Sequence, residues 1–144
     1  MSDDRHTLAI QLTTELLAAD QALRARVGQV LPKGMEISHF SVLNFLAWQG
    51  EEASPGQLAR KFGVTRGAMS NTLRKLEWAG YIHIRPDWDD ARRKQVDIST
   101  AGRQARDDAL AAVSPMMDDI VDGLGETQAR AALPILRAIR LRQN

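Results

Sequence analysis

The chain has 144 residues, of which 44% are apolar and 26% are charged, and it contains no cysteine. This length and composition fit one globular domain and exclude disordered, collagen-like and disulfide-stapled proteins, together with enzymes built from two large lobes. The lack of cysteine excludes thiol nucleophiles, thiolate metal sites and disulfides. No apolar run approaches the roughly 20 residues of a membrane span, and the N-terminus lacks the features of a secretory signal, so we expect a cytoplasmic protein without membrane contact.

The net charge of +1 is unevenly distributed along the chain. Residues 1–53 carry four Lys and Arg against seven Asp and Glu, residues 54–103 carry ten against five, and residues 104–144 carry five against six. A basic middle segment between acidic flanks favours a partner that is anionic and bound locally.

Apolar residues at three- and four-residue steps predict a long helix over residues 1–31, which Pro32 and Gly34 end. We expect Ser38 to cap a second helix that ends near Gly50. The apolar stripe of this second helix comprises Phe40, Leu43, Phe45, Leu46 and Trp48.

The segment 54–57, Ser-Pro-Gly-Gln, has the form of a capping box and predicts a short helix that Gly63 ends. Thr65 is expected to cap the next helix, whose inner face carries Met69, Leu73 and Leu76 and which Gly80 ends. From Tyr81 the apolar period changes to two, which predicts an antiparallel hairpin with a charged tip over residues 86–93.

Ser99 is expected to cap a helix that runs to Leu124 and is kinked by Pro115, because an interior proline removes a hydrogen bond. A last helix is expected over about Thr127 to Leu141, with Pro134 in its interior. The predicted fold is mainly α with a small β-hairpin wing (α+β), in one compact domain. Its parts are an N-terminal dimerisation helix at 1–34, a winged helix-turn-helix at 35–103 and C-terminal dimerisation helices at 104–144.

Two short helices joined by a tight glycine turn and followed by a hairpin are typical of a winged helix-turn-helix, whose second helix can lie in the major groove of DNA. The outward face of residues 65–78 carries small, hydrogen-bonding or basic side chains, which suit contact with bases and phosphates. Residues 65–76 include no acidic residue, which would repel phosphate. This face comprises Arg66, Gly67, Ser70, Asn71 and Arg74.

The order of these elements resembles that of the MarR family of transcriptional regulators over essentially the whole chain. The resemblance is sharpest in segments 58–65, 73–82, 90–92 and 96–102. The resemblance implies a homodimer joined through the terminal helices, which binds a pseudo-palindromic operator as a repressor and is often released by a small ligand. It also places Asp90 and Arg92 at the Asp-x-Arg motif of the wing, whose arginine enters the minor groove. This chain departs from the family pattern at Ala91 and Ser99, and neither departure removes a charge that the motif needs.

The candidate DNA-binding residues are Ser54, Thr65, Arg66, Gly67, Ser70, Asn71, Arg74, Lys75, Asp90, Arg92 and Arg93. The expected partners are double-stranded DNA, a second copy of the chain and a small-molecule effector. Met116 and Met117 fit either an effector cavity or packing in the core or dimer.

We expect no catalytic activity, no metal and no cofactor, because His6, His39 and His83 lie far apart and no phosphate-binding glycine motif occurs. The sequence leaves two other classes of function open. One is a winged helix that docks a protein partner instead of DNA, and the other is a small enzyme with a cleft at a dimer interface.

Overall fold

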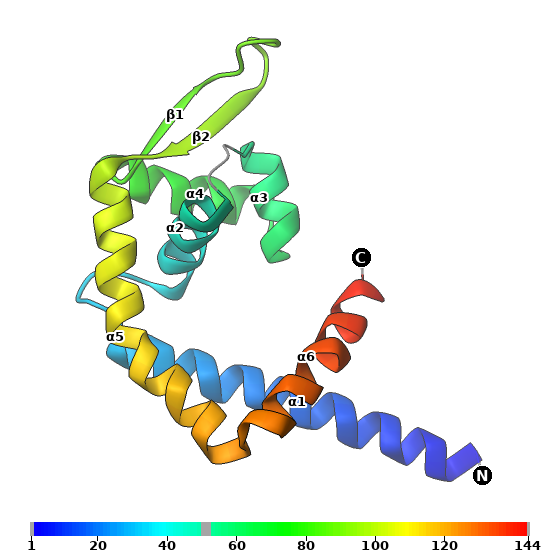
Figure 1. Ribbon diagram of the computed structural model, residues 1–144. Helices are drawn as coiled ribbons and strands as arrows, with labels where there is room; N and C mark the ends of the chain where they lie inside the picture. The colour runs from blue at the N-terminus through cyan, green and yellow to red at the C-terminus, as the bar shows by residue number, and fades with distance from the viewer. Residues whose placement is uncertain (1, 50–52, 144) are drawn as a thin grey trace.

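A computed structural model describes residues 2–49 and 53–143 of the chain. Its helices and strands follow the predicted order, with a two-stranded antiparallel hairpin between the fourth and fifth helices (Figure 1). Their bounds are α1 (Ser2–Val30), α2 (Ile37–Gln49), α3 (Pro55–Phe62), α4 (Arg66–Trp78), β1 (Ile82–Pro86), β2 (Lys94–Ile98), α5 (Thr100–Leu124) and α6 (Glu126–Leu141). The predicted winged-helix fold, mainly α with a hairpin wing, is confirmed.

The molecule has a winged part and a helical part, which α5 connects (Figure 1). Helices α2, α3 and α4 gather at the base of the hairpin, while α1 and α6 lie at the other end of α5. Helix α5 changes direction partway along, as expected for a helix that contains Pro115. The wing is therefore carried on a compact core, away from both chain termini.

The core of the winged part is formed by leucines from three helices and by one residue from each strand. Leu43, Leu46, Leu58, Leu73 and Leu76 are at most 2% exposed, and they pack with Ile82 and Val96. Burying each of these side chains stabilises the fold by about 1.5–3 kcal/mol. Since Leu73 and Leu76 fix one face of α4 in this core, the opposite face is turned outward.

A second, smaller core lies where α5 crosses α1 and α2. It contains Leu31, Phe40, Ala109, Val113 and Met116, all buried. This cluster attaches the winged part to the helical part.

The predicted helix caps of the winged region are present. The Ser54 hydroxyl accepts from Gln57 N–H over 3.2 Å, and the Gln57 side chain accepts from Ser54 N–H over 2.9 Å. Thr65 accepts from Ala68 N–H over 3.1 Å. Each cap satisfies a backbone donor that the first turn of its helix leaves without a partner.

The wing is held to the domain at its base by short-range polar contacts. Ser99 caps α5, and it also donates from its hydroxyl to Gly80 O over 2.6 Å and from its N–H to Tyr81 O over 2.9 Å. A Cβ at Gly102 would overlap the Tyr81 carbonyl group, so only glycine permits this close approach. On the other side, Val96 N–H donates to Ala53 O over 2.8 Å, which ties β2 to the segment before α3.

Two details of the second helix differ from prediction. Ser38 lies inside α2, which begins at Ile37, so it does not cap the helix. Instead, the backbone N–H of Glu36, directly before α2, donates to Nδ1 of His39 over 3.2 Å. Trp48, predicted to share the apolar stripe, is 83% exposed, because it lies in the last turn of α2, past the leucines that enter the core. The predicted end near Gly50 falls outside the described residues.

The helical part leaves much apolar surface exposed. Neither α1 nor α6 contains a buried residue. Side chains about half exposed or more include Leu8, Ile10, Leu12, Leu17, Leu133, Ile135, Leu136 and Leu141. Within the described residues, no helix is long and apolar enough to cross a membrane.

Candidate nucleic-acid interface

The outward face of α4 carries the small, polar and basic residues that its helical period predicts. Arg66, Gly67, Ser70, Asn71 and Arg74 are exposed, while Met69, Leu73 and Leu76 are buried beneath them. Arg74 Nη2 donates to Asn71 Oδ1 over 2.6 Å, so these two side chains present a joined set of donors and acceptors. Such a face can contact base edges and phosphates without like-charge repulsion.

A basic cleft of about 470 Å³ lies between the start of α3, the start of α4 and the wing. Its lining includes the predicted residues Ser54, Arg66, Arg92 and Arg93. It also includes Arg60 and Lys94, which the sequence prediction missed. No carboxylate side chain is among the described residues that line it. The cleft can therefore hold an anionic backbone.

A neighbouring cleft of about 370 Å³ continues this surface along α4. It shares Arg66 and Lys94 with the first cleft and extends to Ser70 and Arg74, with Glu77 as its acidic lining residue. Because the two clefts share Arg66 and Lys94, basic residues line a joined surface from α4 to the wing.

In the wing, the two charged residues of the Asp-x-Arg motif, Asp90 and Arg92, contact each other. The Asp90 carboxylate accepts from Arg92 Nε and from Arg92 N–H, both over 3.1 Å, and from Nη2 over 3.4 Å. These hydrogen bonds lower the pKa of Asp90 below its usual value, with a smaller contribution from the charge of Arg93. Since the Arg92 side chain is 92% exposed, its guanidinium is oriented yet accessible.

The structure does not bring Lys75 to this surface. Lys75 pairs with Glu36 over 3.7 Å and lines a separate cavity of about 330 Å³ beside His39 and Tyr81. Successive residues of an α-helix point about 100° apart around its axis, so Arg74 and Lys75 reach different sides of α4.

Arg60 and Lys94 carried weak signals that sequence reasoning could have used. Arg60 follows Leu58 and Ala59, which form the inner face of α3, so the helical period turns Arg60 outward. Lys94 begins β2, two residues before the buried Val96. Their approach to Arg66 depends on how the wing folds back over α3, which no local pattern encodes.

His39 is buried away from the basic surface. Its Nε2 has no hydrogen-bond partner, and burial lowers the pKa of the imidazole, with Glu36 raising it and Lys75 lowering it further. Among the described residues no group of three or more His, Asp or Glu side chains is arranged to hold a metal ion.

Comparison with known proteins gives a consistent result. A model of the MarR family matches residues 33–93. The HTH-type transcriptional regulator YdgG of Bacillus subtilis, itself described as uncharacterized, is 24% identical over 97% of this chain and 93% of its own length. The matched family and this relative are transcriptional regulators, and neither match indicates an enzymatic family.

Two solved structures share the fold. A mutant of MarR from E. coli complexed with operator DNA has a TM-score of 0.79 at 19% identity, covering 91% of this chain and 94% of that one. CouR from Rhodococcus jostii RHA1, bound to p-coumaroyl-CoA, has a TM-score of 0.79 at 24% identity, covering 89% of this chain and 90% of that one. The winged region of this chain therefore matches the MarR family model, and nearly the whole chain shares the fold of winged helix-turn-helix regulators of the MarR type.

Proposed function

We propose that this protein is a sequence-specific regulator that binds double-stranded DNA through α4 and the wing. The observation that carries the proposal is the continuous basic surface from Arg74 through Arg66 to Arg92 and Arg93. A wing that docked a protein partner would not need this acid-poor surface or an arginine oriented by a carboxylate. The fold match to a MarR structure complexed with operator DNA supports the same reading.

In this proposal α4 enters the major groove with its outward face against base edges. Gly67 and Ser70 permit close approach, while Asn71 and Arg74 supply hydrogen bonds to bases or phosphates. The Ser54 and Thr65 hydroxyls, which already accept backbone hydrogen bonds, each retain one O–H to donate to a phosphate oxygen. Arg92 enters the minor groove, where narrow A·T tracts strengthen its binding.

The proposed functional unit is a homodimer through residues 1–34 and 104–144. Helices α1 and α6 expose many apolar side chains, whereas scattered single apolar residues are normal on a protein surface. A concentration of exposed apolar side chains on two helices usually marks an interface. A two-fold axis through these helices would place two α4 helices on half-sites about 10 base pairs apart, centre to centre. The target is then a pseudo-palindromic operator.

We further propose that the regulator is a repressor released by a small, largely apolar effector. A cavity of about 340 Å³ lies between α1 and the winged part, lined by Arg24, Ser41, Phe62 and Met69 among others. A ligand there would change the spacing of the two α4 helices if it bound one spacing better than the other. CouR, which shares the fold, was solved bound to p-coumaroyl-CoA. Met116 is buried in the second core, which favours its packing role over a cavity role.

Selection of bound fragments from the host's genomic DNA by the purified protein tests the proposal and yields the operator. We expect enrichment of a pseudo-palindromic sequence. A panel of phenolic and drug-like compounds should then include one that weakens binding to the selected fragment. Recovery of random fragments at every salt concentration would contradict sequence-specific regulation, and an unresponsive panel would remove support for the effector.

A further inference from the structure

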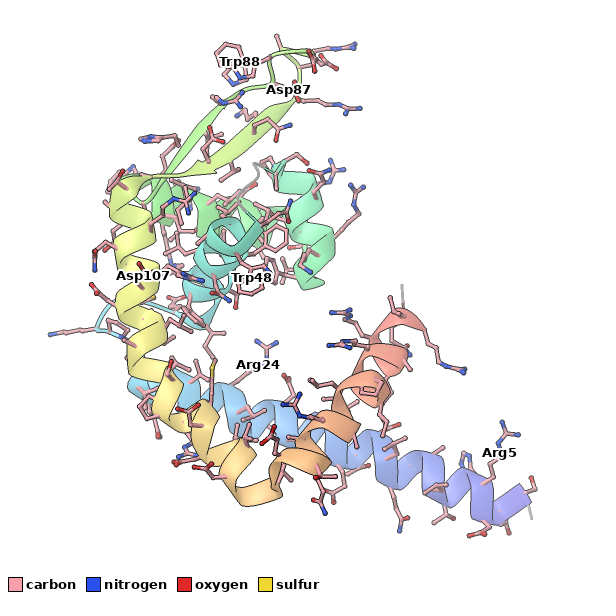
Figure 2. The ribbon with its side chains drawn as sticks, viewed as in Figure 1. Arg5, Arg24, Trp48, Asp87, Trp88 and Asp107 are labelled. Atoms are coloured by element: carbon pink, nitrogen blue, oxygen red, sulfur yellow. The ribbon has the colours of Figure 1, made fainter. Side chains whose placement is uncertain are left out.

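Trp88 stands at the tip of the wing, where Figure 2 shows it beyond the strands of the hairpin. The residue is 85% exposed. Tryptophan has one of the largest apolar surfaces of any side chain, so leaving it in water forgoes the free energy that its burial would give. Trp48 and Trp78 are also 83% and 89% exposed, so what distinguishes Trp88 is its place at the tip of the wing.

The tip that carries Trp88 is fixed by hydrogen bonds on both sides of this residue. The Asp87 carboxylate accepts from Asp89 N–H over 2.8 Å and from Gln95 Nε2 over 2.7 Å. Asp87 N–H donates to Arg93 O over 3.0 Å. A loop already ordered in this way presents its side chain without a further ordering cost on binding.

Arg85 fixes the ring itself. Its guanidinium carbon lies 4.9 Å from the centroid of the Trp88 ring, a cation–π contact. Arg85 in turn donates from Nε to Asp97 over 3.0 Å and from Nη1 to Pro86 O over 3.0 Å. The ring is thus held against a cation that is itself anchored to both strands, while most of its surface stays open.

The surroundings of the ring select the chemistry of its partner. Arg85, Arg92 and Arg93 lie on the same short loop and its adjoining strand. Of the acidic residues of this loop, Asp87 and Asp90 accept hydrogen bonds within it, and Asp89 is exposed beside Trp88. An apolar ring beside three arginines, two of whose neighbouring aspartates are already hydrogen-bonded, fits a polymer that alternates apolar and anionic surface. The deoxyribose–phosphate strand of DNA has this pattern.

We propose that Trp88 is a second DNA-contacting residue of the wing. Its ring packs against the deoxyribose of the strand that borders the minor groove entered by Arg92, with the neighbouring phosphates near Arg85 and Arg93. This inference rests on the proposed DNA-binding function. It assigns an apolar, salt-independent contribution to a wing whose other contacts are charged.

Comparison of Trp88→Ala with Trp48→Ala tests this assignment on a duplex of about 30 base pairs. Figure 2 shows Trp48 on the body of the domain, away from the wing, and Trp48 is 83% exposed, so it is a matched control. We expect Trp88→Ala to weaken binding about tenfold. The slope of the logarithm of the association constant against the logarithm of the salt concentration should stay unchanged, because a contact with deoxyribose releases no counterion. Trp48→Ala should bind as the unaltered protein does.

Fluorescence gives a readout that is independent of affinity. The double variant Trp48→Phe, Trp78→Phe leaves Trp88 as the sole tryptophan. Addition of the duplex should shift its emission to the blue, because the ring leaves water. Unchanged emission and unchanged affinity of Trp88→Ala, with DNA still bound, would overturn the role of Trp88 and leave the proposed function standing. No binding by the unaltered protein would overturn both.

Discussion

The Asp90–Arg92 pair makes a prediction whose sign separates two roles for an acidic residue beside DNA. If Asp90 orients the guanidinium, Asp90→Ala should weaken operator binding although it removes a negative charge. Arg92→Ala should weaken it by about 1–3 kcal/mol and lower the salt slope by about one unit. The measurement is fluorescence anisotropy of a labelled duplex over a series of salt concentrations.

Asp89 provides the matched control, because it lies in the same loop and its removal changes the net charge equally. Asp89→Ala should bind DNA as tightly as the unaltered protein or more tightly. Tighter binding by Asp90→Ala, with the fold intact, would show that Asp90 only repels phosphate.

His39 predicts how stability depends on pH. Burial lowers its pKa in the folded chain below the unfolded value of about 6.5, so the unfolded state binds more protons as the pH falls past that value. The free energy of unfolding should therefore decrease as the pH falls below about 6.5. His39→Asn, which keeps an acceptor for Glu36 N–H, should flatten this decrease in urea titrations. An identical pH profile in both proteins would contradict the assignment.

At the scale of elements, the capping box of α3 has a structural role and a proposed binding role that substitution can separate. Ser54→Ala removes the acceptor for Gln57 N–H and should lower the free energy of unfolding by about 1 kcal/mol. Ser54→Asp keeps a good N-cap but places a carboxylate in the basic cleft. This variant should keep its stability in urea titrations and lose DNA affinity. Equal DNA affinity for Ser54→Asp and the unaltered protein would remove Ser54 from the interface.

The elements were predictable where local chemistry determines them. The caps at Ser54, Thr65 and Ser99 and the stop at Gly63 lie within three or four residues of the groups they satisfy, so the sequence contains both partners. The hairpin followed from the change of apolar period at Tyr81. The prediction that Ser38 caps α2 was wrong, because the helix begins before Ser38 and its start is stabilised by the hydrogen bond from Glu36 N–H to His39.

The candidate interface was predictable in part, for the same reason. The outward face of α4 follows from helical period, and the Asp90–Arg92 contact spans two residues. By contrast, Lys75 is held away from this face by its ion pair with Glu36, and the basic cleft forms only because Arg60 of α3 lies near the wing. Those contacts join distant segments and arise only from the packed fold.

At the scale of the whole molecule, the exposed apolar faces of α1 and α6 predict an obligate partner. Leu136 is 47% exposed on α6, so Leu136→Glu should leave the monomer fold intact while it prevents association. Sedimentation should show a dimer for the unaltered protein and a monomer for this variant, which should also bind DNA more weakly. Trp48→Glu, an equally apolar-to-charged change outside these helices, should stay dimeric. A monomeric unaltered protein at micromolar concentration, even with operator present, would contradict the dimer.

The central claim is that the basic surface formed by α4, the start of α3 and the wing binds duplex DNA. The salt dependence of binding tests it most directly, because each phosphate contact releases counterions. We predict a linear fall of log K with log salt, and a shallower slope for a variant that carries Arg60→Ala and Arg93→Ala in the basic cleft. A binding constant that does not change with salt, or no binding to duplex DNA at low salt, would contradict the account.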